Sequence, residues 1–208
     1  MIFGEKIGNN EYENVFMKQV DNKKIRTSNS TFTSQVESKT FLKMLQENVA
    51  KKIDNKMVPI QDVIQKSNYI SIYIGNTDFI DKIKFDKTTK QANYDLEVLQ
   101  RQIDMTTLNV YHIIEEIKNI NEYCKIIVLS TYFPYYDLES HALEELQNFF
   151  NTFNDELEQL CKDSNASYLD ISLLGKSNYF LESTYTINDA GHQYLGNKIY
   201  QCAIDEIC

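Results

Sequence analysis

The amino-acid sequence predicts an α/β fold: a three-layer α/β/α sandwich around a mostly parallel sheet. Residues 68–75 (NYISIYIG) and 125–130 (KIIVLS) are short apolar runs rich in β-branched side chains, which is typical of strands buried on both faces of a parallel sheet. Between such runs lie longer segments with apolar residues at every third or fourth position, which is typical of amphipathic helices. This alternation of strand and helix along the chain favours the layered architecture.

The other elements follow from the same two patterns. Further strands are expected at residues 1–3, 24–27 and 166–171. Helices are expected at residues 34–53, 59–66, about 93–119, 138–161 and 190–207, with Asn188 as the N-cap of the last one. No shift in composition divides the chain, so we expect residues 1–208 to form a single domain.

Composition and charge disfavour several classes of function. The chain has 30 acidic and 21 basic residues and a formal net charge of −9, whereas proteins that neutralise phosphates concentrate Lys and Arg on one face. We therefore expect no nucleic-acid partner and no binding to anionic membranes. No apolar run is long enough for a signal peptide or a spanning helix, so a cytoplasmic protein is expected. The four cysteines form no CxxC or Cys/His cluster, and we expect no metal and no cofactor.

Polar residues at the predicted carboxyl ends of the strands are the candidates for function, because ligands of open α/β sheets bind there. One predicted strand runs into Gly75-Asn76-Thr77-Asp78. Near the C-terminus the segment YTINDAGHQYLG contains Asp189 and His192 in the spacing DxxH, with which many serine esterases supply an aspartate and a histidine to their nucleophile.

These motifs occur in an order that resembles the SGNH (GDSL) hydrolase family. A helix precedes the strand that ends in IGNTDF; a long helix, a strand leading to TYFP, a second long helix, a short strand and NDAGHQYLG follow it. The resemblance covers nearly the whole chain and implies a flavodoxin-like sandwich that hydrolyses acyl or acetyl esters. That chemistry needs a serine activated by a histidine, an aspartate that orients the histidine, and donors to the oxyanion.

The first three blocks of the family pattern depart from it in this chain. Residues 4–7 (GEKI) stand where the family has GDSL, so Lys6 occupies the nucleophile position. Asn29 stands at about the position of the glycine whose N–H group joins the oxyanion hole. Thr77 replaces the asparagine of GxND that donates its side-chain amide. A lysine replaces serine in acyl transfer only when it is deprotonated, and its ordinary pKa lies about three units above neutral pH.

The last block admits two registers. In the literal register, Asp189 and His192 are the catalytic pair. In the shifted register, which the resemblance favours, GHQYLG aligns with the Gly-His that begins the final helix of the family, and Asn188 is the asparagine of an HPN motif. The positions of the catalytic histidine and aspartate are then Thr186 and Ser183, and no member of the catalytic set is intact.

Three functional hypotheses follow. The leading one is a catalytically degenerate hydrolase-like protein that binds a small polar or anionic ligand, or a protein partner, at a crevice lined by the degenerate site positions Lys6, Asn29, Thr77, Ser183 and Thr186. The runner-up is an active esterase that uses Asp189, His192 and an unidentified serine. The third makes the acidic surface, rich in the 14 tyrosines, a docking face for another protein.

Overall fold

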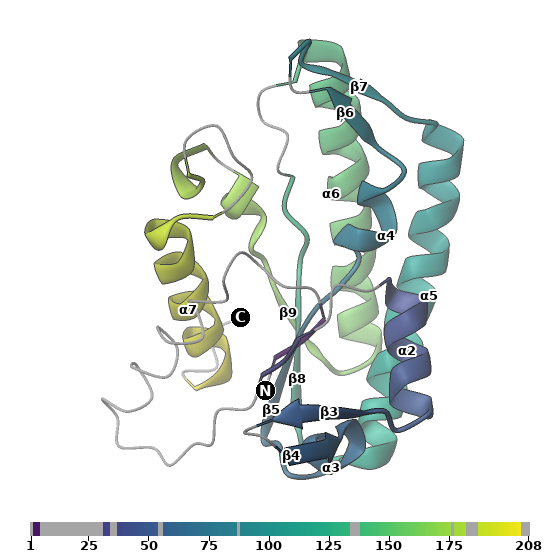
Figure 1. The fold of residues 1–208 in the computed structure, drawn as a ribbon, viewed down its shortest axis with the longest axis vertical. Helices are drawn as coiled ribbons and strands as arrows, with labels where there is room; N and C mark the ends of the chain where they lie inside the picture. The colour runs from purple at the N-terminus through teal and green to yellow at the C-terminus, as the bar shows by residue number, and fades with distance from the viewer. Residues whose placement is uncertain are drawn as a thin grey trace.

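The computed structural model describes residues 2–4, 31–33, 37–53, 56–86, 88–133, 138–175, 177–181 and 187–204. Five parallel strands in the order β2-β1-β5-β8-β9 form the central sheet (Figure 1). They are β1 (Ile2–Gly4), β2 (Thr31–Thr33), β5 (Tyr69–Tyr73), β8 (Lys125–Leu129) and β9 (Ser167–Leu169). Numbered along the chain, this is the strand order 2-1-3-4-5 of flavodoxin-like sheets.

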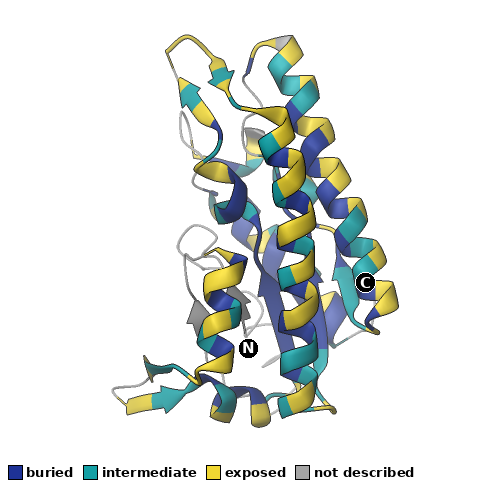
Figure 2. Cartoon of the chain, turned by 90° about the vertical axis from the view of Figure 1, so that its right-hand side faces the viewer, coloured by how far each residue is buried: buried dark blue, intermediate teal, exposed yellow. Residues whose placement is uncertain are grey.

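Helices cover both faces of the sheet. On one face lie α2 (Ser38–Gln46), α3 (Ile60–Gln65), α5 (Leu96–Ile120) and α6 (Ser140–Asp163), and α7 (Asp189–Ala203) lies on the other (Figure 1). Figure 2 shows the first layer from outside, with exposed residues along the outer surfaces of the helices and buried residues towards the sheet. The predicted three-layer α/β/α sandwich is confirmed.

Alternation along the strands produces two cores. Ile70, Ile72 and Ile74 pack against the four-helix layer, whereas Tyr73 packs against α7 with Leu195. Side chains of a strand point alternately to the two faces of its sheet, so a continuous apolar run is what a strand covered on both faces requires. None of the helices in the described ranges is long and apolar enough to span a membrane.

Short helices, hairpins and 3-10 turns lie at the two ends of the sheet. The hairpin of β3 (Ala50–Ile53) and β4 (Lys56–Pro59) lies near the end where the strands begin. At the other end are α4 (Asn76–Ile80), the hairpin of β6 (Lys84–Asp86) and β7 (Gln91–Asn93), and the 3-10 turns η1 (Ser172–Gly175) and η2 (Ser177–Tyr179). The sequence patterns did not predict these elements.

The helix predicted at residues 34–53 is wrong in its second half. In the structure α2 ends at Gln46, because Asn48 adopts the left-handed conformation with a φ of 51°. The N–H groups of Asn48 and Val49 then bond to the carbonyls of Leu45 and Met44, which is the Schellman pattern that ends a helix. Residues 50–53 continue as strand β3.

Other predicted elements stand as follows. The strands expected at 1–3, 68–75, 125–130 and 166–171 and the other four helices are confirmed, with ends shifted by a few residues. The strand expected at 24–27 lies outside the described residues, and the strand that pairs with β1 begins at Thr31.

Candidate functional site at the carboxyl end of the sheet

The GNTD segment lies where the sequence placed it, directly beyond β5. Gly75 has a φ of 121° and precedes α4, whose first residues are Asn76 and Thr77. A Cβ atom at Gly75 would meet the ring of Phe153 at 2.7 Å, so both the backbone conformation and the packing require glycine. Thr77, the predicted replacement of the amide donor, is half-buried at this end of the sheet.

Asp78 connects this segment to the start of α2. Its carboxylate accepts a hydrogen bond from the Ser38 N–H group at 2.9 Å and another from the Ser38 hydroxyl at 2.7 Å. Asn109 of α5 donates its side-chain amide to the same hydroxyl at 2.9 Å. Asp78 and Ser38 are 1% and 0% exposed, and burial raises the pKa of Asp78 against the opposing effect of these bonds. The pair therefore fixes the segment after β5 against the helix that follows β2.

A second serine–aspartate contact follows the next two strands. Ser130, directly after β8, donates to the carboxylate of Asp170 at 3.3 Å and accepts from the Ile171 N–H group at 2.8 Å. Ser130 is 0% exposed. A nucleophilic serine must reach the substrate and hand its proton to a base, usually a histidine. Both Ser38 and Ser130 are sealed from solvent and bonded to a carboxylate, so neither is placed as a nucleophile.

The start of α7 bears directly on the two registers. Asn188 is the N-cap, as predicted, and its side-chain oxygen accepts from the Gly191 N–H group at 3.0 Å. Its side-chain amide donates to the carbonyls of Asn178 and Phe180 at 2.9 and 3.0 Å. A Cβ atom at Gly191 would lie 2.9 Å from the Tyr179 carbonyl oxygen. The Asn-x-x-Gly spacing is thus a structural clamp between α7 and the turn at 177–180.

Asp189 and His192 differ sharply in environment. Asp189 is exposed in the first helical turn, where a carboxylate complements the free N–H groups. His192 belongs to the first turn of α7 and is only 3% exposed. Its backbone N–H group donates to the Asn188 carbonyl at 3.0 Å.

The remaining predicted site residues, Lys6, Asn29, Ser183 and Thr186, lie outside the described residues. Among the described ones, no group of three His, Cys, Asp or Glu side chains has metal-binding geometry. The Asp78–Ser38–Asn109 network was not predicted from the sequence, although the sequence of α5 contains one indication of it. Thr106 and Asn109 interrupt the apolar face of α5, and polar residues on such a face need a buried partner.

Comparisons with known proteins agree with this architecture. The family model of GDSL-like lipases and acylhydrolases matches residues 5–199. Among solved structures, the lipase Lip_vut3 from a goat rumen metagenome has a TM-score of 0.72 at 16% identity, covering 98% of this chain and 95% of its own. Axe2, an acetylxylan esterase from Geobacillus stearothermophilus, has a TM-score of 0.63 at 15% identity, with coverage of 98% and 92%. No curated protein matches the chain.

Proposed function

Because the chain belongs to the family of GDSL-like lipases and acylhydrolases, we propose that it is a member without ester hydrolysis that binds a ligand at the carboxyl end of its sheet. The observation that carries the proposal is the clamp of Asn188 and Gly191 at the start of α7. It supports the shifted register, in which these residues begin the final helix and the catalytic histidine and aspartate would have stood at Thr186 and Ser183.

The chemistry of acyl transfer explains why this register matters. A catalytic histidine needs one ring nitrogen within hydrogen-bond reach of the nucleophile and the other bonded to an orienting carboxylate. Buried His192 and exposed Asp189 make a poor pair for that task. With Lys6 at the nucleophile position, Ser183 and Thr186 supply hydroxyls but neither a base nor an acid. Such a site binds a polar oxygen without cleaving an ester.

The ligand of such a site is expected to carry a carboxylate, a phosphate or sugar hydroxyls. Lys6 supplies a cation, and the hydroxyls of Thr77, Ser183 and Thr186 supply donors and acceptors. Axe2 is an acetylxylan esterase, so short xylooligosaccharides join acetate and inorganic phosphate as probes.

Reinstalling the catalytic set tests the register. The variant with Lys6→Ser, Ser183→Asp and Thr186→His, carrying Thr77→Asn as well, is expected to gain hydrolysis of nitrophenyl acetate above the wild type. The matched control carries only Lys6→Ser and Thr77→Asn, so it retains Ser183 and Thr186, and it is expected to remain inactive. Hydrolysis by the unmodified chain that disappears in His192→Ala would overturn the proposal and establish Asp189 and His192 as the catalytic pair.

Ligand binding is tested separately by thermal shift. A ligand that binds only the folded state raises the melting temperature as its concentration exceeds its Kd. We expect a rise with at least one of acetate, phosphate and xylobiose, and loss of that rise in Lys6→Ala. No shift with any of the three probes, together with a specific protein partner, would instead favour the docking face.

A further inference from the structure

A polar groove runs between α6 and the edge strand β9 and reaches Asp170, the carboxylate that accepts from Ser130. Its volume is about 670 Å³, within the range of pockets that accept a ligand or several side chains. One face of α6 and alternate residues of the β9 segment line it: Asn151, Asn154, Asp155, Glu158, Cys161 and Lys162, and Ala166, Tyr168, Asp170 and Ser172. None of the predicted site residues belongs to this α6–β9 groove.

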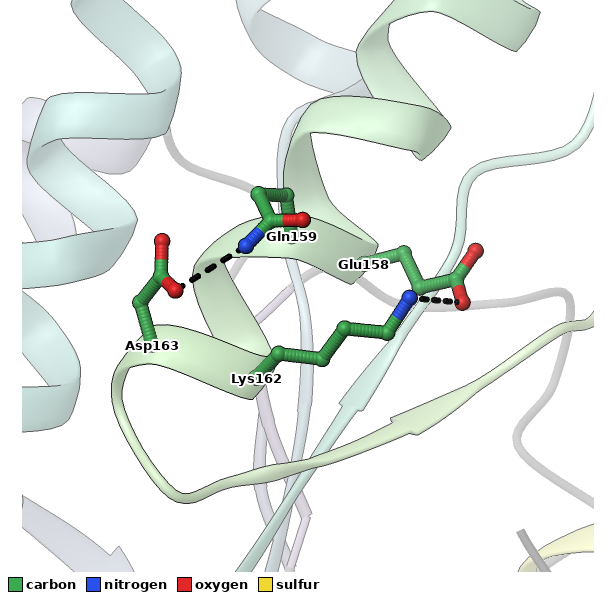
Figure 3. A network of polar contacts seen from close by, with 4 residues as sticks. All are labelled: Glu158, Gln159, Lys162 and Asp163. Atoms are coloured by element: carbon green, nitrogen blue, oxygen red, sulfur yellow. Dashed lines mark hydrogen bonds and ion pairs between the residues drawn. The ribbon is translucent and has the colours of Figure 1, made fainter.

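The groove is acidic around a partly apolar lining. Asp155, Glu158 and Asp170 contribute carboxylates. Among the described residues of its lining, Lys162 is the one cation, and its ammonium nitrogen is 2.7 Å from a carboxylate oxygen of Glu158 (Figure 3). Asp155 and Asp170 have no ion pair within the described parts of the chain. Burial and all three carboxylates raise the pKa of the Tyr168 phenol, so the negative charges act on one small volume. Such a groove suits a cationic partner that also carries an apolar side chain.

The β3–β4 hairpin has this complementary chemistry. Lys52 and Lys56 are exposed, and neither has an ion pair with any residue that the structure describes. Met57 is 66% exposed and lies opposite Lys52 in the hairpin register, so their side chains share one face. Figure 2 shows the hairpin projecting from the lower end of the molecule. Although the chain has a net charge of −9, this projecting hairpin therefore presents two lysines and an exposed methionine.

We propose that a second copy of this chain is the partner, with the β3–β4 hairpin of one copy seated in the α6–β9 groove of the next. Lys52 meets Asp155 and Asp170, and Met57, on the same face of the hairpin, covers the apolar lining at Cys161 and Ala166. Lys56, on the opposite face, adds to the positive charge of the hairpin. The two surfaces lie on different parts of the molecule, so the contact is heterologous, and repetition gives a ring or an open filament. The inference does not depend on the proposed ligand site.

Sedimentation of the full chain tests the contact. At about 1 mM protein, where even a Kd of 1 mM leaves much of the protein bound, we expect a mean mass above the monomer at low salt. Raising the salt from about 0.01 M to about 1 M shortens the Debye length from about 30 Å to about 3 Å and should return the mass towards the monomer. A monomer throughout at low salt would overturn the proposal.

Two variants separate the halves of the contact. The hairpin variant Lys52→Glu/Lys56→Glu and the groove variant Asp155→Lys/Glu158→Gln should each be monomeric. Mixed in equal amounts they should form a dimer that does not extend, because each variant retains one intact half. Assembly that survives in both variants, or a mixture that remains monomeric, would contradict the proposed contact.

A matched control removes the effect of net charge. Lys39→Glu/Lys66→Glu replaces two exposed lysines elsewhere and changes the net charge by the same amount as the hairpin variant. It should assemble like the wild type. Loss of assembly in this control would show that general repulsion, and not the hairpin, governs association.

Discussion

Replacing Asn188 with alanine tests the clamp at the start of α7. The change removes the cap of the Gly191 N–H group and two donors to the carbonyls of Asn178 and Phe180. Loss of an N-cap costs about 1 kcal/mol, and each of the other bonds contributes about 1 kcal/mol net. Because Asn188 is only half-buried, water replaces part of this loss. We expect the free energy of unfolding to fall by about 2–3 kcal/mol.

Urea titration measures this loss as a lower midpoint with an unchanged slope. Asn188→Asp retains the acceptor for Gly191 but loses both donors, so an intermediate loss of about 1–2 kcal/mol is expected. The matched control is Asp189→Ala at the exposed neighbouring position, where loss of the interaction with the helix dipole costs about 0.5 kcal/mol. If Asn188→Ala is no more destabilising than Asp189→Ala, the structural role of the clamp is refuted.

Three further predictions concern buried positions. Gly75→Ala should lower the free energy of unfolding by about 3 kcal/mol, since φ is 121° and the new Cβ would meet Phe153 at 2.7 Å; a urea midpoint within error of the wild type would refute this. Because the folded-state pKa of Asp78 is raised above its ordinary value of 3.8, its contribution to stability is present in full below that value and is lost as the pH rises through the folded pKa. Urea titrations across this pH range should show this decline in the wild type relative to Asp78→Asn, and parallel curves would contradict it. Burial raises the pKa of Cys161 to about 12, so iodoacetamide at about pH 8 should modify this thiol only after unfolding; rapid labelling of the native protein, read by mass spectrometry, would count against its burial.

The central sheet was predictable because its strands are covered on both faces. Residues such as Ile72 and Ile127 belong to uninterrupted apolar runs, and the helices between these runs favour parallel pairing. The order of the strands was not predicted, because the pattern within each strand does not say which strands pair. The ends of helices were harder to place. Asn48 and Asn165 end α2 and α6 in the left-handed conformation, where glycine is the usual signal, and the chain has only six glycines.

The candidate site was predictable only in part. The position of Thr77 after β5 and the cap at Asn188 follow from local pattern, and the structure confirms both. The bonds of Asp78 to Ser38 were not predictable, because they join residues 40 positions apart through tertiary packing. The same holds for the α6–β9 groove, whose carboxylates come from two elements that are ordinary surface segments when read separately.

Labelling with a fluorophosphonate, read by intact-protein mass spectrometry, distinguishes a degenerate site from an active serine esterase. The reagent reacts with an activated serine, and we expect no adduct on the wild type because the shifted register leaves Lys6 at the nucleophile position and Thr186 at the position of the catalytic histidine. His112→Ala, at an exposed position of α5, serves as the control for His192→Ala. An adduct that forms on the wild type and on His112→Ala but not on His192→Ala would show that His192 activates a serine and that the catalytic set is intact.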